Sequence, residues 1–462
     1  MLGIIIGLIT MVIVGWAILK SKYPQLVLFA SGLFMLLCAV ALDLGPILPK
    51  KALPTGNEYL DVVEFIRYMF SNNLADLGLL IMVMVGFANF MTHIGANDAF
   101  VNFAIRPLSI VKNTYILIFF AFLLGKAVSM VITSAVGLGV LCLTLMGPAL
   151  SHMGLNKKAI AAIFVTSGAA SMVLIGGTTA ASAKACGISI LDYVFLYKIP
   201  AALPTILCMG IAHVFWQRYL DKKEGWVCAD HRGETMVFEE DVKAPSTAAP
   251  KIYAFLPFLP MVFVVLFSEY GIKGIKLHIS ALIIFCVIIG LFCEAIRWKF
   301  DFQKLADGLK VFLQAMGKSL TGVVSLLIAA GVFAAGFKAL GMVDALVHTA
   351  NQFGTGAIGM SILFVAITSI VTIIAGSNGA SFYPLVEMIP KIAKDMGVNP
   401  VALVLPMHQA STIVRPLSPV AGVVVAISSM LKMNPMDLIK RASVPSLVGL
   451  VVHHIFVFWL SV

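Results

Sequence analysis

Long apolar runs recur along the whole chain and are separated by short polar segments. A helix needs about 20 mostly apolar residues to cross the hydrocarbon core of a bilayer, and most of these runs approach that length. We therefore expect ten membrane-crossing helices. They lie near residues 2–19, 25–44, 75–94, 159–183, 194–216, 252–269, 278–296, 319–340, 400–427 and 445–461.

Two further apolar segments, 114–152 and 357–395, each contain a central break rich in Ser and Gly. The first break is Thr133–Gly139 and the second is Ala375–Ser381. Polar, irregular backbone at membrane depth is tolerated only where protein or a water-filled cavity surrounds it. We interpret both segments as re-entrant hairpins, which enter and leave the membrane on the same side.

The two breaks belong to a repeat that runs along the chain. Ser377 follows Ser134 by 243 residues, and the motif Met-Gly-x-Asn recurs at the same spacing around Gly154 and Gly397. Each copy holds five crossings and one hairpin, so the copies have opposite orientations in the membrane. The predicted fold is an all-α polytopic membrane protein with an inverted-topology repeat, about ten transmembrane helices, two re-entrant hairpins and two broken helices.

The repeat divides the chain into three parts. Residues 1–216 form the first repeat, residues 217–250 a charged cytoplasmic linker, and residues 251–462 the second repeat. Residues 59–70 and 302–317 occupy matching places in the two repeats, and we expect them to be amphipathic helices at the membrane surface.

Composition and charge agree with this prediction. Only 12% of the 462 residues are charged and 60% are hydrophobic, whereas a soluble domain has about 25% charged residues. The net charge is +10, and one set of loops is richer in basic residues, among them Lys157, Lys158 and Arg441. The opposite set is poorer and includes Lys184 and Lys198. The richer side is expected to be cytoplasmic, which places both termini outside. The positive charge therefore gives no reason to expect a nucleic-acid partner.

The sequence lacks motifs for several other kinds of chemistry. It has no Walker A motif for ATP, and Gly137-Leu-Gly139 is too short for a dinucleotide-binding loop. The seven cysteines lack the spacing of metal ligands, so we expect no metal site, no disulfide framework and no cofactor. An enzyme is not expected.

Each hairpin is followed by a crossing with a polar interruption, 159–183 in the first repeat and 400–427 in the second. In the second crossing, Pro416 and Pro419 remove backbone donors and break the helix. The free N–H groups at the start of the next half-helix can bind an anion. Hydroxyl and amide groups add neutral donors, so we predict a carboxylate site. The polar residues assigned to it from the two crossings are Ser167, Thr178, Thr179, Gln409, Ser411 and Thr412.

Arg415 lies near the middle of the second broken crossing, where an arginine costs about 2.5–3.5 kcal/mol on insertion scales. Its planar guanidinium can bind a carboxylate through two hydrogen bonds. We interpret Arg415 as the residue that binds a substrate carboxylate. The structural alternative is that it pairs with Asp344 or Glu387, or that it caps carbonyls freed by Pro416.

Three residues are candidates for coupling transport to an ion. His408 titrates near neutral pH when it is unperturbed, so it is a candidate proton relay; the alternative is a hydrogen-bonded packing residue. Glu387 lies on the second arm of the second hairpin, where it either carries a proton or faces solvent. Asn378, together with carbonyls freed at the helix breaks, is a candidate ligand for sodium.

Several segments of the chain carry a specific pattern in combination. They are Thr92–Asp98, His213–Glu224, Val386–Pro390, Gln409–Ser411, Arg415, Leu417–Pro419 and Lys440–Arg441. Together these segments resemble the anaerobic C4-dicarboxylate carrier family, DcuC. The similarity covers essentially the whole chain. It implies a bacterial inner-membrane carrier of the ion transporter superfamily that exchanges succinate, fumarate, malate or related dicarboxylates. It also implies a homodimer, no catalytic residues and an elevator motion.

The resemblance assigns substrate-binding roles to both hairpin tips and to the second broken helix. The residues at the matching positions are Ser134, Gly137, Ser377, Asn378, Gly379, Arg415, Ser418 and Pro419. Exchange and symport with protons or sodium both stay open. A carrier of the same architecture for another organic anion, such as a monocarboxylate or an amino-acid derivative, is the first alternative. An anion channel is the second, and hairpins that open to opposite sides favour alternating access over it.

Overall fold

The computed structural model describes residues 2–20, 23–49, 52–105, 113–174, 176–234, 236, 249–267, 272, 277–345, 348 and 356–461. These residues are predominantly helical, with one isolated β-bridge between Met153 and Arg232. The first half contains α1 (Leu2–Leu19), α2 (Pro24–Ala41), α3 (Glu58–Asn73), α4 (Leu79–His93), α5 (Ala96–Ile105), α6 (Thr114–Ser129), α7 (Ala135–His152), α8 (Lys157–Thr166), α9 (Gly177–Cys186), α10 (Ile190–Asp192) and α11 (Ile199–Glu224). The second half contains α12 (Leu259–Leu266), α13 (Ile279–Arg297), α14 (Phe302–Ser319), α15 (Ser325–Ala339), α17 (Gly356–Ala375), α18 (Asn378–Val386), α19 (Ile389–Met396), α20 (Val401–Ile413), α21 (Gly422–Met430) and α22 (Pro435–Ser461).

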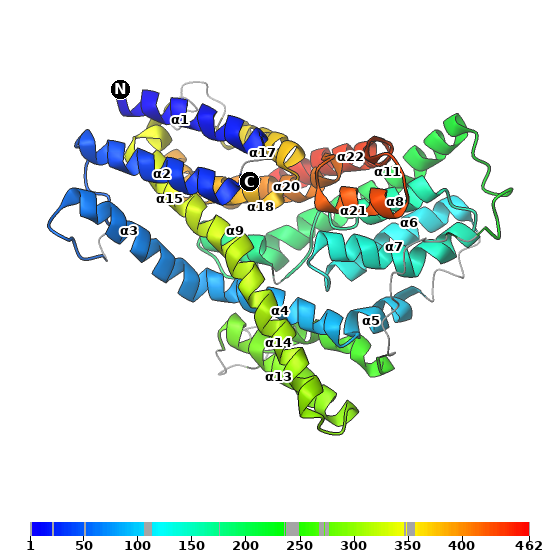
Figure 1. The fold of residues 1–462 in the computed structure, drawn as a ribbon. Helices are drawn as coiled ribbons and strands as arrows, with labels where there is room; N and C mark the ends of the chain where they lie inside the picture. The colour runs from blue at the N-terminus through cyan, green and yellow to red at the C-terminus, as the bar shows by residue number, and fades with distance from the viewer. Residues whose placement is uncertain are drawn as a thin grey trace.

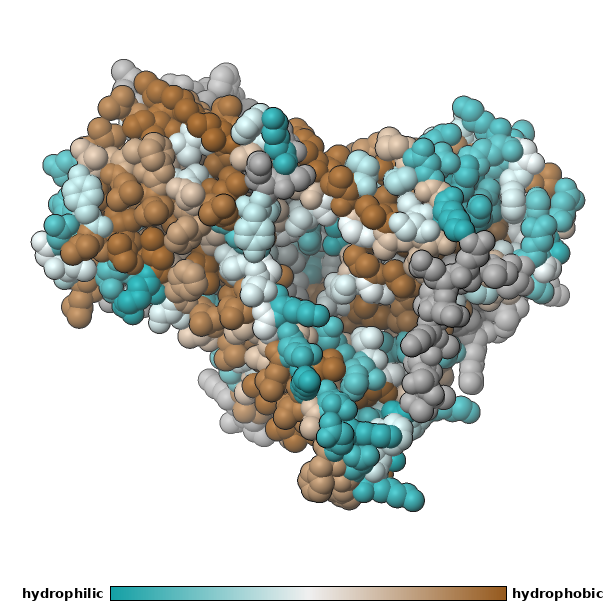
Figure 2. Space-filling view, in the orientation of Figure 1, coloured by the Kyte–Doolittle hydropathy of each residue, from teal (hydrophilic) through white to brown (hydrophobic). Residues whose placement is uncertain are grey.

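The helices form two lobes, as Figure 1 shows. One lobe contains α1, α2 and α17, the other contains α6, α7, α8 and α21, and α4, α13 and α14 lie below the space between them. In Figure 2 apolar side chains cover much of the first lobe, and the surface is hollowed between the two lobes. Large apolar side chains such as Val12, 72% exposed, and Phe215, 69% exposed, identify faces suited to lipid.

Among the described residues, eight helices are long and apolar enough to cross a bilayer, or nine when the bent pair α4 and α5 counts as one crossing. This confirms the multi-pass, all-α architecture. The set differs from the ten expected crossings. The crossings expected at 2–19, 159–183 and 252–269 contain shorter or broken helices, whereas the hairpin arms α7 and α17 are long enough to be counted.

Local geometry repeats between the two halves. A π-helical turn, Leu74–Gly78, joins α3 to α4, and a second one, Leu320–Val324, joins α14 to α15 at a spacing of 246 residues. Gly95 and Gly341 have the same spacing and nearly the same left-handed φ angles, +77° and +76°. The amphipathic helices expected at 59–70 and 302–317 are therefore present as α3 and α14, but they continue through π turns into the next helices.

Each expected hairpin contains two helical arms joined at a serine. In the first, α6 and α7 are separated by residues 130–134, and the hydroxyl of Ser134 accepts a hydrogen bond from the amide of Gly137 (3.2 Å). In the second, the hydroxyl of Ser377 caps α18 in the same way, through the amide of Ala380 (3.4 Å). The first break therefore precedes most of the predicted stretch 133–139, because residues 135–139 already belong to α7.

Both expected broken helices are present. In the first, α8 ends at Thr166 and α9 begins at Gly177. In the second, α20 ends at Ile413, a 3-10 turn spans Arg415–Leu417, and α21 begins at Gly422. A proline ring cannot donate a backbone hydrogen bond, which accounts for the second break because Pro416 and Pro419 both lie within it.

The halves are not separate bodies, because helices of one half pack on helices of the other. The pairs are α2 with α15, α4 with α14, α7 with α21, and α11 with α22. One buried apolar cluster contains Phe122 of α6, Phe164 of α8 and Val424 of α21. Hairpin one and both broken helices therefore meet inside the molecule.

Three expectations about charged segments need correction or remain open. The linker was expected to begin at residue 217, but α11 continues to Glu224; residues 235 and 237–248 of the linker lie outside the described residues. Lys198 and Arg441 were interpreted as loop residues, which is wrong, because Lys198 is 0% exposed and Arg441 is 1% exposed. The division into 1–216, 217–250 and 251–462 stays a prediction.

Candidate functional site

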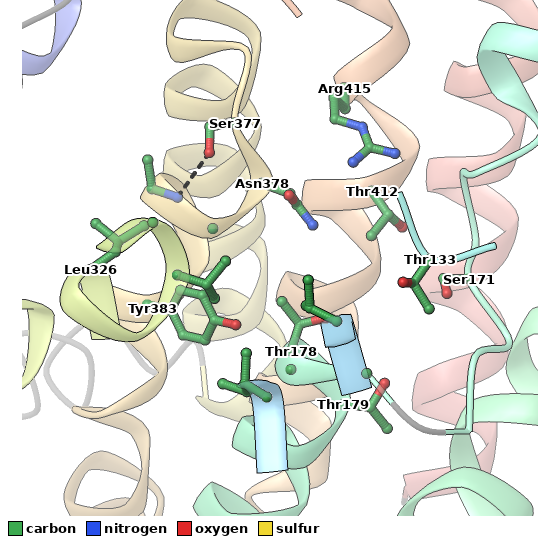
Figure 3. A pocket seen from close by; sticks show the side chains of 18 of the residues that line it. Thr133, Ser171, Thr178, Thr179, Leu326, Ser377, Asn378, Tyr383, Thr412 and Arg415 are labelled. Carbon is green, nitrogen blue, oxygen red and sulfur yellow. Dashed lines mark hydrogen bonds between the residues drawn. The ribbon is translucent and has the colours of Figure 1, made fainter. Parts of the chain in front are cut away.

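A cavity of about 520 Å³ lies where both hairpins and both broken helices meet α2, α4 and the second π turn. Figure 3 shows the side chains around it. Half of the residues predicted to bind substrate line this cavity. They are Thr178, Thr179, Ser377, Asn378, Gly379, Thr412 and Arg415.

Two helices begin at the cavity wall, α9 at Gly177 and α18 at Asn378. The first N–H groups of a helix have no acceptor within the helix and carry partial positive charge. No side chain caps the start of α9. A Cβ atom at Gly177 would lie 2.9 Å from the hydroxyl of Tyr383, so the close approach of these segments requires glycine. The wall thus combines free amides with hydroxyl groups.

Arg415 directs its guanidinium into the cavity near Asn378 and Thr412, as Figure 3 shows. Its Nε is buried without a hydrogen-bond partner, and no ion pair joins Arg415 to a carboxylate among the described residues. Neither alternative carboxylate pairs with Arg415. Asp344 forms an ion pair with Lys391, and Glu387 does not line the cavity. The structure therefore leaves the guanidinium without a carboxylate from the described part of the chain.

His408 does not line the cavity but contacts a residue that does, and it is only 1% exposed. Its Nε2 lies 2.9 Å from the hydroxyl of Thr178, which lines the cavity. Its Nδ1 lies 3.1 Å from the hydroxyl of Tyr193 and 3.2 Å from that of Ser182. Both ring nitrogens therefore have partners, and His408 fixes the position of Thr178.

Two predicted residues face a different cavity. Ser134 and Gly137 line a second cavity of about 320 Å³, bounded by α4, α5 and α7. Thr133 lines both cavities. The tip of the first hairpin therefore lies between the two cavities, with Ser134 and Gly137 facing only the second.

Three predicted residues are buried beside the cavity and form hydrogen bonds within the protein. The hydroxyl of Ser167 donates to a carbonyl of α8 (2.9 Å), and that of Ser411 donates to a carbonyl of α20 (2.7 Å). The side-chain amide of Gln409 donates to the backbone carbonyl of Ser171 (2.8 Å), a residue that lines the cavity. These groups support the wall rather than face the space.

The last predicted residues, Ser418, Pro419 and Glu387, are not among those that line the cavity. Ser418 is buried with an unpaired hydroxyl, and Pro419 is exposed at the turn before α21. Glu387 follows α18 and does not line the cavity. The cavity thus brings together predicted residues from the second hairpin tip and from both broken helices, but not all of the residues predicted in these segments.

Several polar cavity residues were missed by the sequence interpretation. Ser171 lies within the first polar interruption, so its position was a usable signal. Gln25 and Tyr383 have apolar or proline neighbours on both sides in the chain, so no polar motif marks them.

Lys198 was also missed and holds part of the cavity wall in place. It ends a π turn, Tyr193–Lys198, before α11. Its Nζ donates to the carbonyl of Val173 (2.9 Å) and to the hydroxyl of Thr179 (2.7 Å), and both of these residues line the cavity. The irregular segment between α8 and α9 is therefore anchored by a buried lysine.

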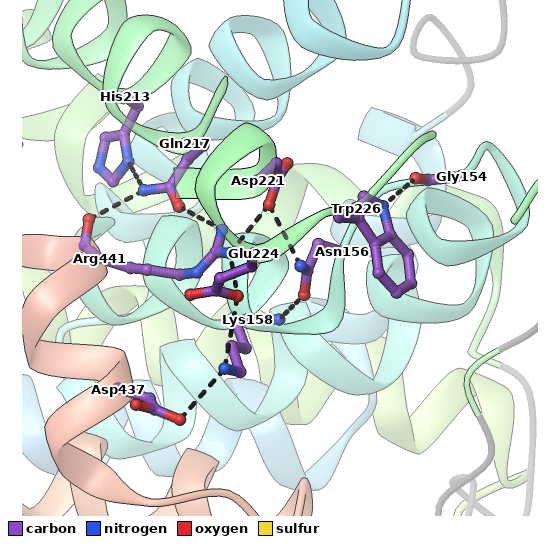
Figure 4. Close-up of polar contacts among 10 residues, drawn as sticks. All are labelled: Gly154, Asn156, Lys158, His213, Gln217, Asp221, Glu224, Trp226, Asp437 and Arg441. Carbon is purple, nitrogen blue, oxygen red and sulfur yellow. Dashed lines mark hydrogen bonds and ion pairs between the residues drawn. The ribbon is translucent and has the colours of Figure 1, made fainter. Parts of the chain in front are cut away.

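A separate polar network lies at the end of α11, as Figure 4 shows. Arg441 of α22 forms ion pairs with Asp221 and Glu224, each at 2.9 Å. It also donates to the side-chain oxygen of Gln217 (3.0 Å), while Asn156 donates to Asp221 (3.1 Å). This network joins helices of the two halves and does not border the cavity.

Comparison with known families identifies the chain. The model of the DcuC family, described as C4-dicarboxylate anaerobic carrier, matches residues 2–462. The chain belongs to this family. It is 38% identical to the anaerobic C4-dicarboxylate transporter DcuC of Escherichia coli strain K12 over 449 residues, covering 97% of this chain and 95% of that protein. It is 36% identical to the probable anaerobic C4-dicarboxylate transporter DcuC of Vibrio cholerae over 451 residues, covering 98% and 96%.

Solved structures show that this DcuC-family chain shares its fold with other transporters. The YdaH transporter of Alcanivorax borkumensis aligns with a TM-score of 0.64 and 15% identity over 95% of this chain and 98% of that one. MtrF of Neisseria gonorrhoeae, described as illuminating a class of antimetabolite efflux pumps, aligns with a TM-score of 0.61 and 14% identity over 95% of both chains. The relatives in the DcuC family are named as transporters, not enzymes.

Proposed function

We propose that this DcuC-family protein is a secondary carrier that exchanges C4-dicarboxylates, such as succinate, fumarate and malate, across the bacterial inner membrane. The observation that carries the proposal is the cavity between the two breaks, with Arg415 unpaired in its wall. The names of the relatives supply the substrate class.

A dicarboxylate has complementary partners at both ends of this cavity. One carboxylate binds the guanidinium of Arg415, whose planar fork matches two carboxylate oxygens. The other accepts hydrogen bonds from the hydroxyl of Thr178 and from free N–H groups at the start of α9. The volume of about 520 Å³ falls in the range typical of small-molecule sites, about 300–1,000 Å³.

The charge of Arg415 supports an exchange of one substrate anion for another. A buried guanidinium without a counter-ion is costly, so a movement that carries the cavity across the membrane is easier when an anion occupies it. The cavity is built from hairpins and broken helices of both halves, so these segments are proposed to move together as an elevator, in a homodimer. We propose that both termini lie in the periplasm, and that His408, Glu387 and Asn378 are the candidates for coupling to protons or sodium.

Counterflow in proteoliposomes tests the proposal. The purified protein is reconstituted, the vesicles are loaded with labelled succinate, and efflux is followed after external fumarate is added. We expect fumarate to accelerate efflux and butyrate, a monocarboxylate of the same length, to have no effect. If fumarate gives no acceleration, exchange of these substrates is wrong; if butyrate accelerates efflux equally, the carrier accepts a broader class of organic anions. Imposing sodium and proton gradients separately then identifies the coupling ion.

A further inference from the structure

Tyr383 lies on α18, the second arm of the second hairpin, and its hydroxyl faces the cavity, as Figure 3 shows. Only 2% of the residue is exposed, so the ring is enclosed by protein. The ring packs edge-on against Phe382, with 5.7 Å between centroids, and against Gly379, where a Cβ atom would lie 3.3 Å from it. Packing within the hairpin therefore fixes where the hydroxyl points.

The hydroxyl of Tyr383 reaches the start of α9, which belongs to the first broken helix. A Cβ atom at Gly177, the first residue of α9, would lie 2.9 Å from the hydroxyl oxygen. The first N–H groups of a helix lack acceptors within the helix and carry partial positive charge, and no side chain caps them here. Tyr383 thus adds an O–H donor to a place where backbone donors are already free.

The hydroxyl of Tyr383 has no hydrogen-bond partner among the described residues. Tyr193, by contrast, places its hydroxyl 3.1 Å from Nδ1 of His408. Polar groups in protein interiors are normally hydrogen-bonded, so an open phenol beside free amides indicates an acceptor that comes from the cavity. An ionised carboxylate only accepts hydrogen bonds, which matches a set of groups that can all donate.

We infer that Tyr383 is a specificity-determining residue whose hydroxyl donates a hydrogen bond to the substrate carboxylate remote from Arg415. In Figure 3 Arg415 and Tyr383 lie apart, with Asn378 between them. A monocarboxylate held by Arg415 brings a methyl group to the start of α9 and leaves these donors unpaired, which disfavours its binding. The inference rests on the proposed function, because it explains how the same cavity distinguishes dicarboxylates from monocarboxylates.

The test removes a single oxygen atom. Exchange of labelled succinate is measured in proteoliposomes with increasing unlabelled succinate or butyrate, at a pH where both are fully ionised. Because one hydrogen bond to a charged group is lost, we expect Tyr383→Phe to raise the succinate concentration for half-inhibition about tenfold and to keep the butyrate value within about twofold. Tyr59→Phe removes the hydroxyl of a tyrosine on α3 that is 55% exposed, and this matched control should change neither value.

An unchanged succinate value in Tyr383→Phe overturns the inference. An equal rise for both anions also overturns it, because the ring would then only shape the wall. A second readout, independent of butyrate, uses the purified proteins: succinate should raise the unfolding temperature of Tyr383→Phe less than that of wild type or Tyr59→Phe, and an equal rise contradicts the inference.

A different variant covers the case in which Tyr383→Phe does not fold. Gly177→Ala places a Cβ atom where it displaces the hydroxyl, and it is judged by the same two half-inhibition values. Failure of wild type to exchange succinate would instead contradict the proposed function, so the two failures are distinguishable.

Discussion

At the scale of single residues, Arg415 is where substrate recognition can be separated from folding. Replacing Arg415 by Lys keeps a positive charge but replaces a planar fork by a point charge. We expect Arg415→Lys to weaken apparent succinate affinity about tenfold or more, as the loss of one of two charge-assisted hydrogen bonds implies. The measurement is the concentration dependence of exchange, normalised to the amount of folded protein.

Expression provides the control for this variant. Because Arg415 has no carboxylate partner among the described residues, its replacement breaks no ion pair that holds the described fold. Arg415→Lys should therefore insert and purify like wild type. Unchanged affinity would contradict its assignment to the substrate, and loss of folded protein would favour the structural alternative.

Gly168 gives a second test at the residue scale, because it lines the cavity and packs directly against Arg415. A Cβ atom there would lie 3.0 Å from Nη2, so the guanidinium must shift by a few tenths of an ångström. We expect Gly168→Ala to weaken succinate affinity by about threefold to tenfold, without changing the preference for dicarboxylates. Gly317→Ala is the control, since a Cβ atom on that glycine of α14 meets nothing within 4 Å. Equal affinities in both variants would show that Arg415 tolerates displacement.

The sequence was informative about residues whose type is unusual for their surroundings. Arg415 was found because an arginine in an apolar crossing is conspicuous, and Ser377 because its motif recurs. Lys198 was misassigned for the opposite reason: it stands near the end of an apolar run, where lysines usually reach the membrane surface. Only the π turn that precedes α11 turns it inward, towards Thr179.

At the scale of elements, the segment between α8 and α9 depends on a long-range anchor. Lys198 donates to Val173 in the irregular segment and to Thr179 in the first turn of α9. We expect Lys198→Met to increase hydrogen–deuterium exchange of peptides that cover residues 171–176 and to weaken succinate binding, because the cavity wall is less fixed. Peptides of α13, which does not border the cavity, provide the internal control. Unaltered exchange in the segment would mean that Lys198 does not anchor it.

Elements were predictable where backbone chemistry marks them along the chain. Both helix breaks and both hairpins follow from Ser, Gly and Pro positions, because these residues cap, bend or interrupt helices. The π turns at Leu74–Gly78 and Leu320–Val324 have no such mark, so α3 and α14 were expected to be separate surface helices. The contacts that form the cavity join segments more than 200 residues apart, and no local pattern specifies them.

At the scale of the whole molecule, the two halves related by the repeat pack against each other along several helices. The packing of α2 on α15 and of α11 on α22 buries each half against the other. A cavity formed by both halves therefore needs both to be folded. The polar network of Arg441 adds a buried ion pair to these contacts, because it joins α22 to Asp221 of α11, which is 0% exposed.

The same network gives the prediction for the molecule as a whole. Arg441→Met leaves the carboxylate of Asp221 buried without its cation, and breaking a buried pair in this way typically costs about 3–5 kcal/mol. We expect a lower unfolding temperature in detergent but unchanged succinate affinity of the folded fraction, since Arg441 lies outside the cavity.

The double variant Arg441→Met/Asp221→Leu shows whether this loss comes from the unpaired charge. Replacing both partners by apolar side chains removes the buried carboxylate, so part of the stability should return. Recovery would mean that the ion pair specifies how α11 meets α22 rather than supplying most of the stability between the halves. A double variant no more stable than Arg441→Met would instead assign the loss to hydrogen bonds of the network. Both variants remove the bond from Arg441 to Gln217, and the double variant also removes the one from Asn156 to Asp221.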